Sequence, residues 1–494
     1  MDVKKKISCD VLVVGGGNAG LCAAIEAKNR GVKPLLIEKG PIKTRGGNSR
    51  LAGSVFRIAY PGGTKDFEPL IKQMQLPKGK IEIEPYTKDE FYNKVMKITD
   101  GLADKRLTEI VVNKSLETIL WMNEQGVRWE LTPDGYVKQG DTLFWPSGPS
   151  VIRSPGSGEG LMEDLYKAAE KRGIEILYET AAESLLTNAD AKVCGVVAKD
   201  LNGYLQIDAK NVILSCGGFQ ANPAWRRRYL GPNWDLVKLR GTRYNTGEGI
   251  TMAVAVGAQL TGHWGGCHAS VVSEDSPMVE AATGEERRYS YPYSIMVNRE
   301  GNRFLDEGND LRPFTYSRFG REILVQPDGI AFQIFDAKTI PLLLPLYQDK
   351  IKVESNSLKE LAEEININVD QFLSTIKTYN AAVQEDKPFV KHRLDGRRTQ
   401  GLNPDKTNWA QKIDTPPYRA YAVVCGLTMT YGGLKANEKA QVIDTADHPI
   451  KGLYAVGEVT GGFFYHNYGS GNGLTRGAVM GRIAGGEAAA NCAG

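Results

Sequence analysis

The sequence predicts an α/β protein in which one domain, built on a doubly wound parallel sheet, is interrupted by an inserted α+β domain. Two observations support this prediction. A strand–helix–strand unit of about thirty residues opens the chain, and glycine-rich, strand-like segments return after residue 420. Between 262 and 420, proline, tyrosine and charge clusters dominate instead. We therefore predict a first domain over 1–261 that resumes at 421–494, and an inserted domain over 262–420.

The opening unit follows from short apolar runs and their punctuation. Residues 10–14 form an apolar run of strand length, 19–30 have helical character, and 33–38 form a second apolar strand. Gly31 ends the predicted helix because glycine adopts the conformation that helix ends require. Further along, the pattern predicts helices within 90–126 and 160–172, a hairpin turning at Asn202-Gly203, and a buried strand over 211–215.

A glycine fingerprint lies between the first strand and the first helix. Gly15, Gly17 and Gly20 have the spacing G-x-G-x-x-G, and Glu38 ends the second strand. The first glycine permits a tight turn, the second admits a pyrophosphate to the helix N-terminus, and the third lets helix and strand pack closely. Glu38 is placed to accept hydrogen bonds from a ribose. The unit is therefore Rossmann-like, and its neighbours Asn18, Ala19 and Lys39 join the predicted nucleotide site.

Three distal segments indicate FAD rather than NAD. A second glycine-rich loop, Arg45-Gly-Gly-Asn-Ser49, follows the strand that ends at Glu38. Gly452 to Glu458 forms a strand that ends in Gly457-Glu458, where a carboxylate can accept from a ribityl hydroxyl. Gly469 to Gly473 precedes a helix near Leu474, whose N–H groups suit the electron-rich end of a reduced flavin. A long cofactor needs all three segments, and an NAD-only enzyme needs none of them.

Across almost its whole length the chain resembles the flavoprotein subunits of the succinate dehydrogenase and fumarate reductase family. The resemblance rests on the fingerprint, 45–49, Leu214 to Phe219 with Asn222, 246–250, 297–307 and 457–485. It implies an FAD-binding domain of the glutathione reductase type, a capping domain at 262–420, and non-covalent FAD. The FAD-binding residues that we predict, beyond those already named, are Gly46, Gly47, Asn48, Gly53, Ser54, Ala182, Cys216, Gly217, Gly218, Thr246, Glu248 and Asn472.

Within the family the chain is most similar to the tricarballylate dehydrogenase branch, through 45–49, 310–316 and 465–468. Two departures concern the substrate. Where soluble fumarate reductases place a histidine and an arginine, this chain has Met429 and Tyr468. One carboxylate clamp of the family is therefore missing, and a tyrosine at that place is similar to the ketosteroid dehydrogenases.

The resemblance implies transfer of two hydrogens across a carbon–carbon bond next to a carboxylate or a ketone. Hydride moves between carbon and flavin N5, while a general acid or base handles the proton. Arg312 is the first candidate for proton transfer or carboxylate binding, because it lies close to the catalytic arginine of fumarate reductases once one insertion is allowed. Interdomain or surface ion pairing is its alternative role. The further candidates are Tyr316, Tyr431, Tyr468 and His466, with pocket packing as the alternative for the tyrosines.

Composition limits the other classes. The 61 basic and 58 acidic residues are spread along the chain, and no nucleic-acid-binding module accompanies them. Seven scattered cysteines and five histidines give no metal-ligand spacing and no disulfide framework, so we predict no metal. Because the sequence shows no signal peptide and no membrane span, we also expect a cytoplasmic protein. No run reaches the roughly 18 apolar residues of a membrane span.

Two alternative functions remain open at this stage. One is a 3-ketosteroid-type dehydrogenase, which Tyr468 favours and the Arg312 segment does not. The other is a flavoprotein electron-transfer subunit, although the large inserted domain exceeds what electron transfer requires. Because no second glycine fingerprint follows a strand, NAD(P)H has no domain of its own. We therefore expect a small carboxylate or cyclic ketone as substrate and an external electron donor or acceptor: a protein, a quinone or oxygen.

Overall fold

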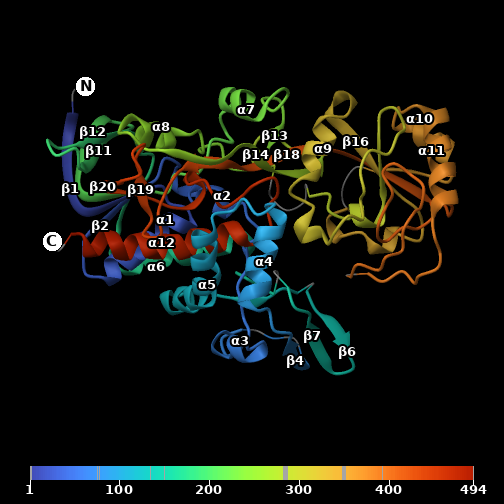
Figure 1. The fold of residues 1–494 in the computed structure, drawn as a ribbon, viewed down its shortest axis with the longest axis horizontal. Helices are drawn as coiled ribbons and strands as arrows, with labels where there is room; N and C mark the ends of the chain where they lie inside the picture. The colour runs from blue at the N-terminus through green and yellow to red at the C-terminus, as the bar shows by residue number, and fades with distance from the viewer. Residues whose placement is uncertain are drawn as a thin grey trace. The chain divides into compact units, whose positions relative to one another are not determined.

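The computed structural model describes residues 3–74, 76, 78–133, 135–148, 151–281, 287–347, 352–391 and 393–492 (Figure 1). The chain divides into two compact units, and each is treated by itself below. Unit 1 comprises residues up to 231, 241–267 and those from 429 onward, whereas unit 2 comprises 232–240 and 268–428. The domain limits that composition predicts, 262 and 420, lie within ten residues of the ends of the longer unit 2 segment. The short segment 232–240, which composition left in the first domain, groups with unit 2.

Unit 1 is built on an eight-stranded sheet. Its central strand β1 (Val3–Val14) pairs in parallel with β2 (Pro34–Ile37) and with β12 (Gly203–Leu214). The residues of β1 from Val11 to Val14 are buried, as expected of an apolar run in a parallel sheet covered on both faces. The remaining strands are β9 (Glu175–Leu177), β10 (Ala181–Thr187), β11 (Val193–Asp200), β19 (Gln441–Ile443) and β20 (Pro449–Ala455).

The strand order explains how the two ends of the chain share one sheet. The main path is β10-β11-β12-β1-β2-β9, and β20 pairs in parallel with β12 beside the first strand. β10 and β11 form an antiparallel pair at one edge of the sheet. The predicted hairpin turn at Asn202-Gly203 leads from β11 into β12. The C-terminal segment therefore completes the sheet that the N-terminal segment begins, and the predicted α/β fold is confirmed.

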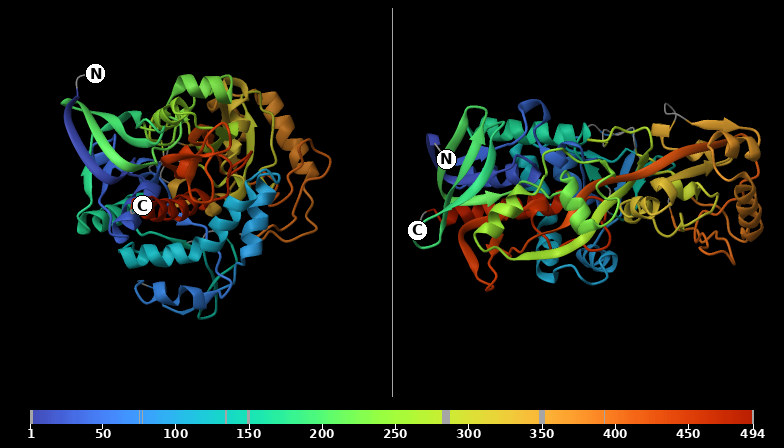
Figure 2. Two further views of the ribbon diagram at one scale, coloured as in Figure 1. Left: turned by 60° about the vertical axis from the view of Figure 1, so that its left-hand side comes forward. Right: turned by 90° about the horizontal axis from the view of Figure 1, so that it is seen from above.

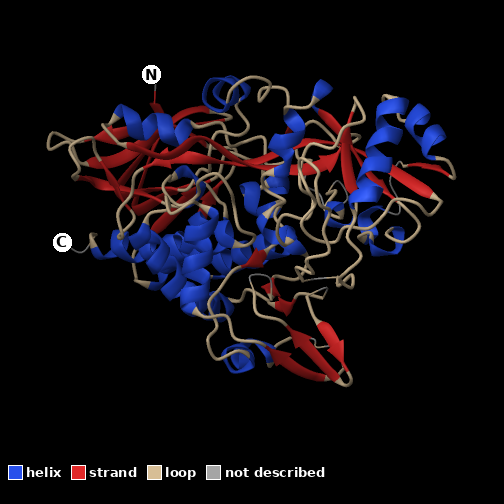
Figure 3. Ribbon diagram, turned by 45° about the vertical axis from the view of Figure 1, so that its right-hand side comes forward, coloured by secondary structure: helices blue, strands red, loops and turns tan. Residues whose placement is uncertain are grey.

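Helices α1 (Asn18–Asn29) and α12 (Asn472–Ala490) pack side by side in unit 1 (Figure 1). Figure 3 shows the helices, strands and loops in separate colours. Glycine makes this approach possible: a Cβ on Gly481 would lie 2.3 Å from the carbonyl oxygen of Ala19, and one on Gly485 would lie 2.2 Å from that of Ala23. The other helices of unit 1 are α2 (Gly47–Arg50), α3 (Thr64–Ile71), α4 (Lys88–Ile98), α5 (Lys105–Gln125), α6 (Ser157–Lys171), α7 (Pro223–Leu230) and α8 (Glu248–Ala255).

Two small three-stranded sheets complete unit 1. The first contains β3 (Val55–Phe56), β5 (Glu130–Leu131) and β8 (Ile152–Arg153). The second contains β4 (Lys80–Ile83), β6 (Val137–Gln139) and β7 (Thr142–Trp145). Sequence analysis did not predict these sheets, because their strands of two to four residues are too short to show a period.

Unit 2 is an α+β unit with its own core. Its sheet has the order β13-β18-β16-β15, and β14 and β17 also pair with β18. The long strands β14 and β18 each continue from one unit into the other along the chain and can be followed in Figure 2. The strands are β13 (Lys238–Leu239), β14 (Leu260–Ser273), β15 (Ile295–Asn298), β16 (Ile330–Phe335), β17 (Val353–Ser355) and β18 (Tyr418–Leu434).

Three helices accompany this sheet, namely α9 (Phe319–Leu324), α10 (Leu358–Glu364) and α11 (Val369–Ala382). Apolar side chains of β15 and β16 form one core with those of α10 and α11, including Val297, Phe332, Leu361 and Phe372. The sheet is therefore covered by the two helices that lie between β17 and β18 in sequence, and such packing of helices on a sheet is expected of an α+β domain.

The segment 297–307, which the resemblance places in the capping domain, supports unit 2 internally. Glu307 is fully buried and accepts hydrogen bonds from Arg303 at 2.7 Å and from the backbone N–H of Met296 at 2.7 Å. Lys406 lies 4.0 Å from the same carboxylate, and its ammonium donates to the carbonyl oxygens of Pro292 at 2.7 Å and Ser294 at 2.8 Å. This network ties three separate segments together, so the motif has an architectural role.

Candidate active site

The fingerprint glycines form the turn that the sequence predicts. Gly15 has a positive φ of 106° and donates to the carbonyl oxygen of Ile37 at 2.8 Å. A Cβ on Gly20 would lie only 2.1 Å from the carbonyl oxygen of Gly15, so any side chain there would push α1 away from the strand. Gly17 caps α1 without a side chain, and a Cβ there would meet nothing closer than 3.6 Å. The turn therefore leaves space beside a helix N-terminus, where an anion is stabilised.

Glu38 lies beside this turn with its carboxylate held in place. It is 6% exposed, and its two oxygens accept from the backbone N–H groups of Gly16 at 2.8 Å and Gly40 at 2.7 Å. Burial raises the pKa of Glu38, and the two hydrogen bonds oppose that effect. Each oxygen keeps a second lone pair, so the carboxylate can also accept from a ribose hydroxyl.

Five more predicted residues meet at the start of α8. The ammonium group of Lys39 donates to the Thr246 hydroxyl at 2.9 Å and contacts the Glu248 carboxylate. Asn222 donates to the carbonyl oxygen of Thr246 at 3.2 Å. Packing also fixes Cys216, since a Cβ on Gly249 would lie 2.2 Å from its sulfur. Residues far apart in sequence thus come together next to the end of β2, where Glu38 lies.

Glu458 is the centre of a second polar group. Its carboxylate accepts from the backbone N–H of Thr430 at 3.0 Å and from the side-chain amides of Asn48 at 3.1 Å and Gln220 at 3.4 Å. Gly218 must lack a side chain here, because a Cβ would lie 2.5 Å from the carboxylate. Burial raises the pKa of Glu458 to about 7 despite these hydrogen bonds. Sequence analysis missed Gln220 and Thr430, although Gln220 directly follows the predicted segment 214–219.

Buried amide atoms test whether these residues fit FAD. Asn472, the first residue of α12, is fully buried, and both its side-chain oxygen and nitrogen lack a hydrogen-bond partner among the described residues. The side-chain oxygen of Gln220 is in the same situation. Such groups cost about 1–3 kcal/mol each unless a ligand completes their hydrogen bonds. Amide donors and acceptors beside a carboxylate match a flavin ring edge and a ribityl chain, so the residues fit the cofactor.

Other predicted cofactor residues are engaged within the protein. The Arg45 guanidinium lies 3.9 Å from the centre of the Tyr166 ring and 3.1 Å from the Glu170 carboxylate. The Ser54 hydroxyl donates to the carbonyl oxygen of Ser154 at 2.9 Å and is fully buried. Ala182 is buried in β10 opposite Ala198. Gly46 and Gly47 have positive φ values of 103° and 55°. The cofactor contacts of these residues and of Gly53 remain predictions.

An aromatic group stands at the start of α12. The Tyr468 hydroxyl accepts a hydrogen bond from the backbone N–H of Gly473 at 3.0 Å. The ring of Phe464 lies 5.0 Å from that of Tyr468 and 5.7 Å from that of Tyr431, between centroids. Tyr468 and Tyr431 are both buried. The two predicted tyrosines, Tyr431 and Tyr468, therefore belong to one aromatic group with Phe464. The Tyr468 hydroxyl also accepts a hydrogen bond from one of the N–H groups at the N-terminus of α12.

His466 occupies a strained backbone position in unit 1. Its φ is +56°, a left-handed conformation that residues other than glycine rarely adopt. Its backbone N–H donates to Nδ1 of His263 at 3.1 Å, and the two rings lie 4.7 Å apart, edge to face. Sequence analysis named His466 as a candidate but did not identify its contact with His263.

The remaining two candidates, Arg312 and Tyr316, belong to unit 2. Arg312 begins a short 3-10 turn, and the backbone N–H of Tyr316 donates to its carbonyl oxygen at 3.1 Å. The Tyr316 ring packs edge to face against His268 at 4.9 Å and against Tyr289 at 5.2 Å. Burial, and then the charge of Arg240, lower the pKa of His268 well below its usual value. His268 is therefore neutral at physiological pH.

Two further arginines lie near this group and were missed by sequence analysis. Arg240 is 7% exposed, and one terminal nitrogen donates to the hydroxyls of Thr428 at 2.9 Å and Ser270 at 3.3 Å. Burial lowers the pKa of Arg287, and the charges of Arg240 and Arg312 lower it further. No local motif marks Arg240 or Arg287, because long-range strand pairing brings them here.

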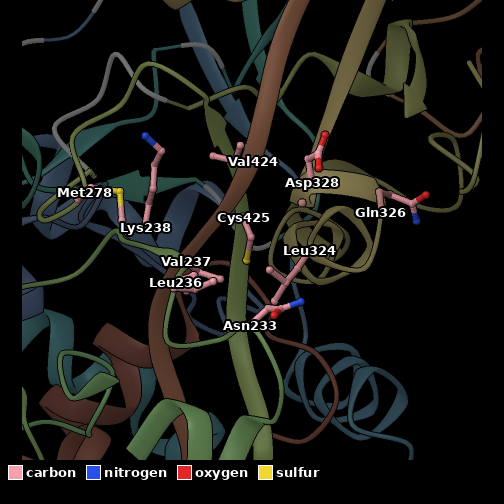
Figure 4. A pocket seen from close by; sticks show the side chains of 11 residues that line it. Asn233, Leu236, Val237, Lys238, Met278, Leu324, Gln326, Asp328, Val424 and Cys425 are labelled. Carbon is pink, nitrogen blue, oxygen red and sulfur yellow. The ribbon is translucent and has the colours of Figure 1, made fainter. Parts of the chain in front are cut away.

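A separate cavity of about 370 Å³ lies within unit 2 (Figure 4). Leu324, Val424 and Cys425 contribute to its walls, and Figure 4 shows Lys238 directed away from Leu324 and Cys425. None of the predicted catalytic residues lines this cavity, so we do not assign the reaction to it. No helix among the described residues is both long enough and apolar enough to cross a bilayer. The cytoplasmic location inferred from the sequence stays a prediction.

Comparison with known proteins identifies the family and the fold. The family model described as "FAD binding domain" matches residues 10–474. A probable fumarate reductase of Shewanella frigidimarina is 29% identical over 97% of this chain and 74% of its own length. An NADH:fumarate oxidoreductase of Klebsiella pneumoniae is also 29% identical, but the chain spans only 48% of that protein. A solved 3-ketosteroid Δ1-dehydrogenase of Sterolibacterium denitrificans has the same fold, with a TM-score of 0.74, 21% identity, and coverage of 98% and 99% of the two chains.

Proposed function

The chain belongs to the FAD-binding domain family, and on that premise we propose that it oxidises or reduces a carbon–carbon bond next to a carboxylate or ketone. The family match and the polar groups around Glu38 and Glu458 account for the cofactor. The single observation that supports the chemistry is the group of Arg312, Tyr316 and neutral His268 in unit 2, which offers proton donors and a positive charge. The fumarate-reducing relatives favour the same reaction class.

In unit 1 we assign the cofactor to the groups that lie just after the carboxyl ends of the central strands of the sheet. Gly15, Gly17 and Gly20 would admit its pyrophosphate, and Glu38 would hold its ribose. Glu458 and Asn472 would hold the ribityl chain and the flavin ring, with Asn48 and Gln220 orienting the carboxylate. When bound, FAD supplies hydride transfer at N5. We propose that the attachment is non-covalent.

The protein's own task is then to move one proton and to stabilise developing enolate charge. Arg312 is the proposed proton-transfer group, and its cation would also stabilise negative charge on a carboxylate. Tyr316 is the second proposed donor, because its ring is fixed by His268 and Tyr289. The neutral imidazole of His268 adds no charge that would repel Arg312 further. An external protein, a quinone or oxygen would exchange electrons with the flavin.

A second candidate is a 3-ketosteroid-type dehydrogenase. The buried aromatic wall of Tyr431, Phe464 and Tyr468 favours it, since a flat apolar substrate suits aromatic faces. The Tyr468 hydroxyl already accepts from a helix N-terminal N–H, a position that would stabilise a phenolate during enolisation. The arginines of unit 2 have no evident partner on a neutral steroid, so we rank this candidate second.

An anaerobic panel tests the proposal. Purified holoenzyme, reduced chemically, is mixed with unsaturated carboxylates and ketones, and oxidised holoenzyme is mixed with their saturated forms, while flavin absorbance near roughly 450 nm is followed. Recovery or bleaching of the flavin by one class identifies the substrate. A flavin that responds to no compound of either class contradicts the proposed function. FAD that stays in the pellet after acid precipitation contradicts non-covalent attachment.

A further inference from the structure

Arg476 is a buried cation of unit 1 that sequence analysis did not single out. It lies near the start of α12 and is 4% exposed. One terminal nitrogen donates to the carbonyl oxygen of Thr460 at 3.1 Å, to its hydroxyl at 2.6 Å and to the carbonyl oxygen of Gly461 at 3.1 Å. None of these acceptors carries a charge. An apolar side chain would fill this space without the cost of burying a cation, so the charge indicates a task beyond packing.

Two carboxylates act on this cation from a distance. Burial lowers the pKa of Arg476 to about 10, and the charges of Asp104 and Glu458 oppose that shift. Asp104 already caps α5, where it accepts from the backbone N–H of Leu107 at 2.9 Å. Burial raises the pKa of Glu458 to about 7. Because electrostatic attraction is mutual, the charge of Arg476 favours the ionised form of Glu458 at neutral pH.

The acceptors of Arg476 also continue the backbone turn that contains Glu458. This turn is a short 3-10 segment, Gly457–Val459, and the Thr460 hydroxyl donates to the carbonyl oxygen of its first residue at 2.8 Å. On the other side, the backbone N–H of Gly461 donates to a carbonyl oxygen of β18 at 3.0 Å. The turn is therefore held between β18 and the Arg476 guanidinium.

Two phenyl rings fix the direction of the guanidinium. Its central carbon lies 5.2 Å from the centre of the Phe463 ring and 5.7 Å from that of the Phe464 ring. Both rings are buried, and their centroids lie 5.0 Å apart, edge to face. A cation over an aromatic face is attracted more strongly when water is excluded. Since the guanidinium is a planar fork of donors, its hydrogen bonds to the turn are preorganised.

We propose that Arg476 is a positioning residue, which fixes the turn of Glu458 and directs this carboxylate towards the cofactor. The inference deepens the proposed function and rests on its assignment of Glu458 to the ribityl chain. Arg476 acts on the backbone through Thr460 and Gly461, and on the carboxylate through its charge. An ionised carboxylate is the stronger acceptor for a ribityl hydroxyl, so both actions support cofactor binding.

The test compares two arginines of α12. Holoenzyme is diluted at neutral pH, and release of FAD is followed by flavin fluorescence to obtain the dissociation constant. Arg476→Met should weaken FAD binding about tenfold, because a displaced carboxylate no longer meets its hydroxyl. Arg476→Lys should recover part of the loss, since it keeps the charge but not the fork.

Arg482→Met is the matched control. Arg482 lies in the same helix, donates to Glu117 at 2.7 Å and stacks on Trp121 at 5.3 Å, but it has no contact with the turn of Glu458 among the described residues. We expect its replacement to change FAD affinity less than about twofold. Equal FAD affinity of wild type, Arg476→Met and Arg476→Lys overturns the proposal.

A double-variant cycle separates positioning from general damage to the fold. Glu458→Gln removes the charge that Arg476 supports, so the two losses should overlap. We expect the double variant Arg476→Met/Glu458→Gln to bind FAD at least about threefold more tightly than the product of the single losses predicts. Arg482→Met combined with Glu458→Gln should give the simple product. Losses that also multiply for Arg476 overturn the positioning role.

Thr460→Val provides a test if Arg476→Met does not fold. It is similar in size but removes the hydroxyl at the shortest of the three contacts, so FAD should bind about threefold more weakly. If Thr460→Val and Arg476→Lys both bind FAD as the wild type does, the proposal is overturned. FAD release needs no substrate, so these results leave the reaction assignment intact. A flavin that responds to no compound of the anaerobic panel contradicts the proposed function itself.

Discussion

The two units present opposite charges to the ligands we assign to them. In unit 1 the key groups are the acids Glu38 and Glu458, surrounded by backbone N–H groups and neutral amides. In unit 2 the key groups are the cations Arg240, Arg287 and Arg312, surrounded by hydroxyls and aromatic rings. The acids of unit 1 suit the hydroxyl and N–H donors of a cofactor, and the arginines of unit 2 suit an anionic substrate. The difference indicates that cofactor and substrate are recognised by separate chemistry, so substitutions should separate the two functions.

The largest expected effect is on the reaction rate. Arg312→Ala should lower kcat about 100-fold to 10 000-fold, because general acid–base catalysis contributes that range, while FAD content stays at the wild-type level. Stopped-flow reoxidation of the reduced flavin by a substrate from the panel measures it. Arg393→Ala is the control. Full activity in Arg312→Ala would remove Arg312 from the mechanism and would leave unit 2 without an assigned proton donor.

Breaking the buried network of unit 2 should mainly affect stability. Lys406→Met leaves Glu307 with one partner fewer and two carbonyl oxygens without their donor, so we expect a loss of about 3–5 kcal/mol in the free energy of unfolding. Urea unfolding followed by circular dichroism measures it. The exposed ion pair of Lys412 with Glu385 gives the control, Lys412→Met, for which we expect at most about 1 kcal/mol.

The pH dependence of Lys406 has a definite sign. Burial lowers its pKa from 10.5 to about 8, even though Glu307 opposes the shift. The folded protein therefore binds this proton less tightly than the unfolded chain does, and stability increases as the pH rises from 8 towards 10. Lys406→Met should lack that increase. A variant that keeps the same increase would show that another group is responsible.

A smaller effect is expected at the fingerprint of unit 1. Gly20→Ala forces a Cβ against the carbonyl oxygen of Gly15 at 2.1 Å, and overpacking costs about 1–3 kcal/mol. We expect FAD to bind about tenfold to hundredfold more weakly, as measured by titration of the apoprotein. Gly486→Ala, in α12, is matched because its Cβ would lie 3.9 Å from the nearest atom. If both variants bind FAD equally well, the turn is not under the proposed constraint.

The smallest effect concerns Glu458. Burial raises its pKa from 4.5 to about 7, so its contribution to stability is present at pH 4.5 and is lost as the pH rises through 7. Glu458→Gln should abolish this loss, which we place at about 1 kcal/mol because the residue as a whole is only half-buried. Urea unfolding of FAD-free protein at pH 5 and pH 8 measures it, with Glu124→Gln on the exposed side of α5 as control. Parallel pH profiles of wild type and Glu458→Gln would contradict the assignment.

Sequence analysis predicted unit 1 well because its chemistry is local. The glycines and Glu38 lie within one strand–helix–strand unit, and the spacing alone indicates what each residue must do. The fold class, the cofactor and the family were confirmed. Thr430 was missed because it contributes only a backbone N–H to Glu458, and any residue type can do that. Sequence analysis also did not identify the hydrogen bond that the Tyr468 hydroxyl accepts from the backbone N–H of Gly473.

Unit 2 was harder to predict because its site depends on pairing between distant strands. Arg240 reaches Thr428 only because β13 pairs with β18, and Arg287 reaches β14 through a single isolated bridge. No residue spacing in the sequence predicts the contact of Arg240 with Thr428 or that of Arg287 with β14. His268 was not among the predicted site residues, yet it lies within β14 and is 2% exposed. Arg312 and Tyr316 were identified only through the family resemblance, and their roles stay predictions.

The backbone of His466 has a consequence for directed evolution. A left-handed conformation costs an L-residue about 1–2 kcal/mol, and glycine would remove most of that cost. A library at this position selected for heat resistance alone should therefore enrich glycine, whereas one selected for turnover should retain histidine if the imidazole serves the reaction. Comparing the residues enriched at position 466 in the two selections would measure how much stability the protein loses by keeping histidine there for its chemistry.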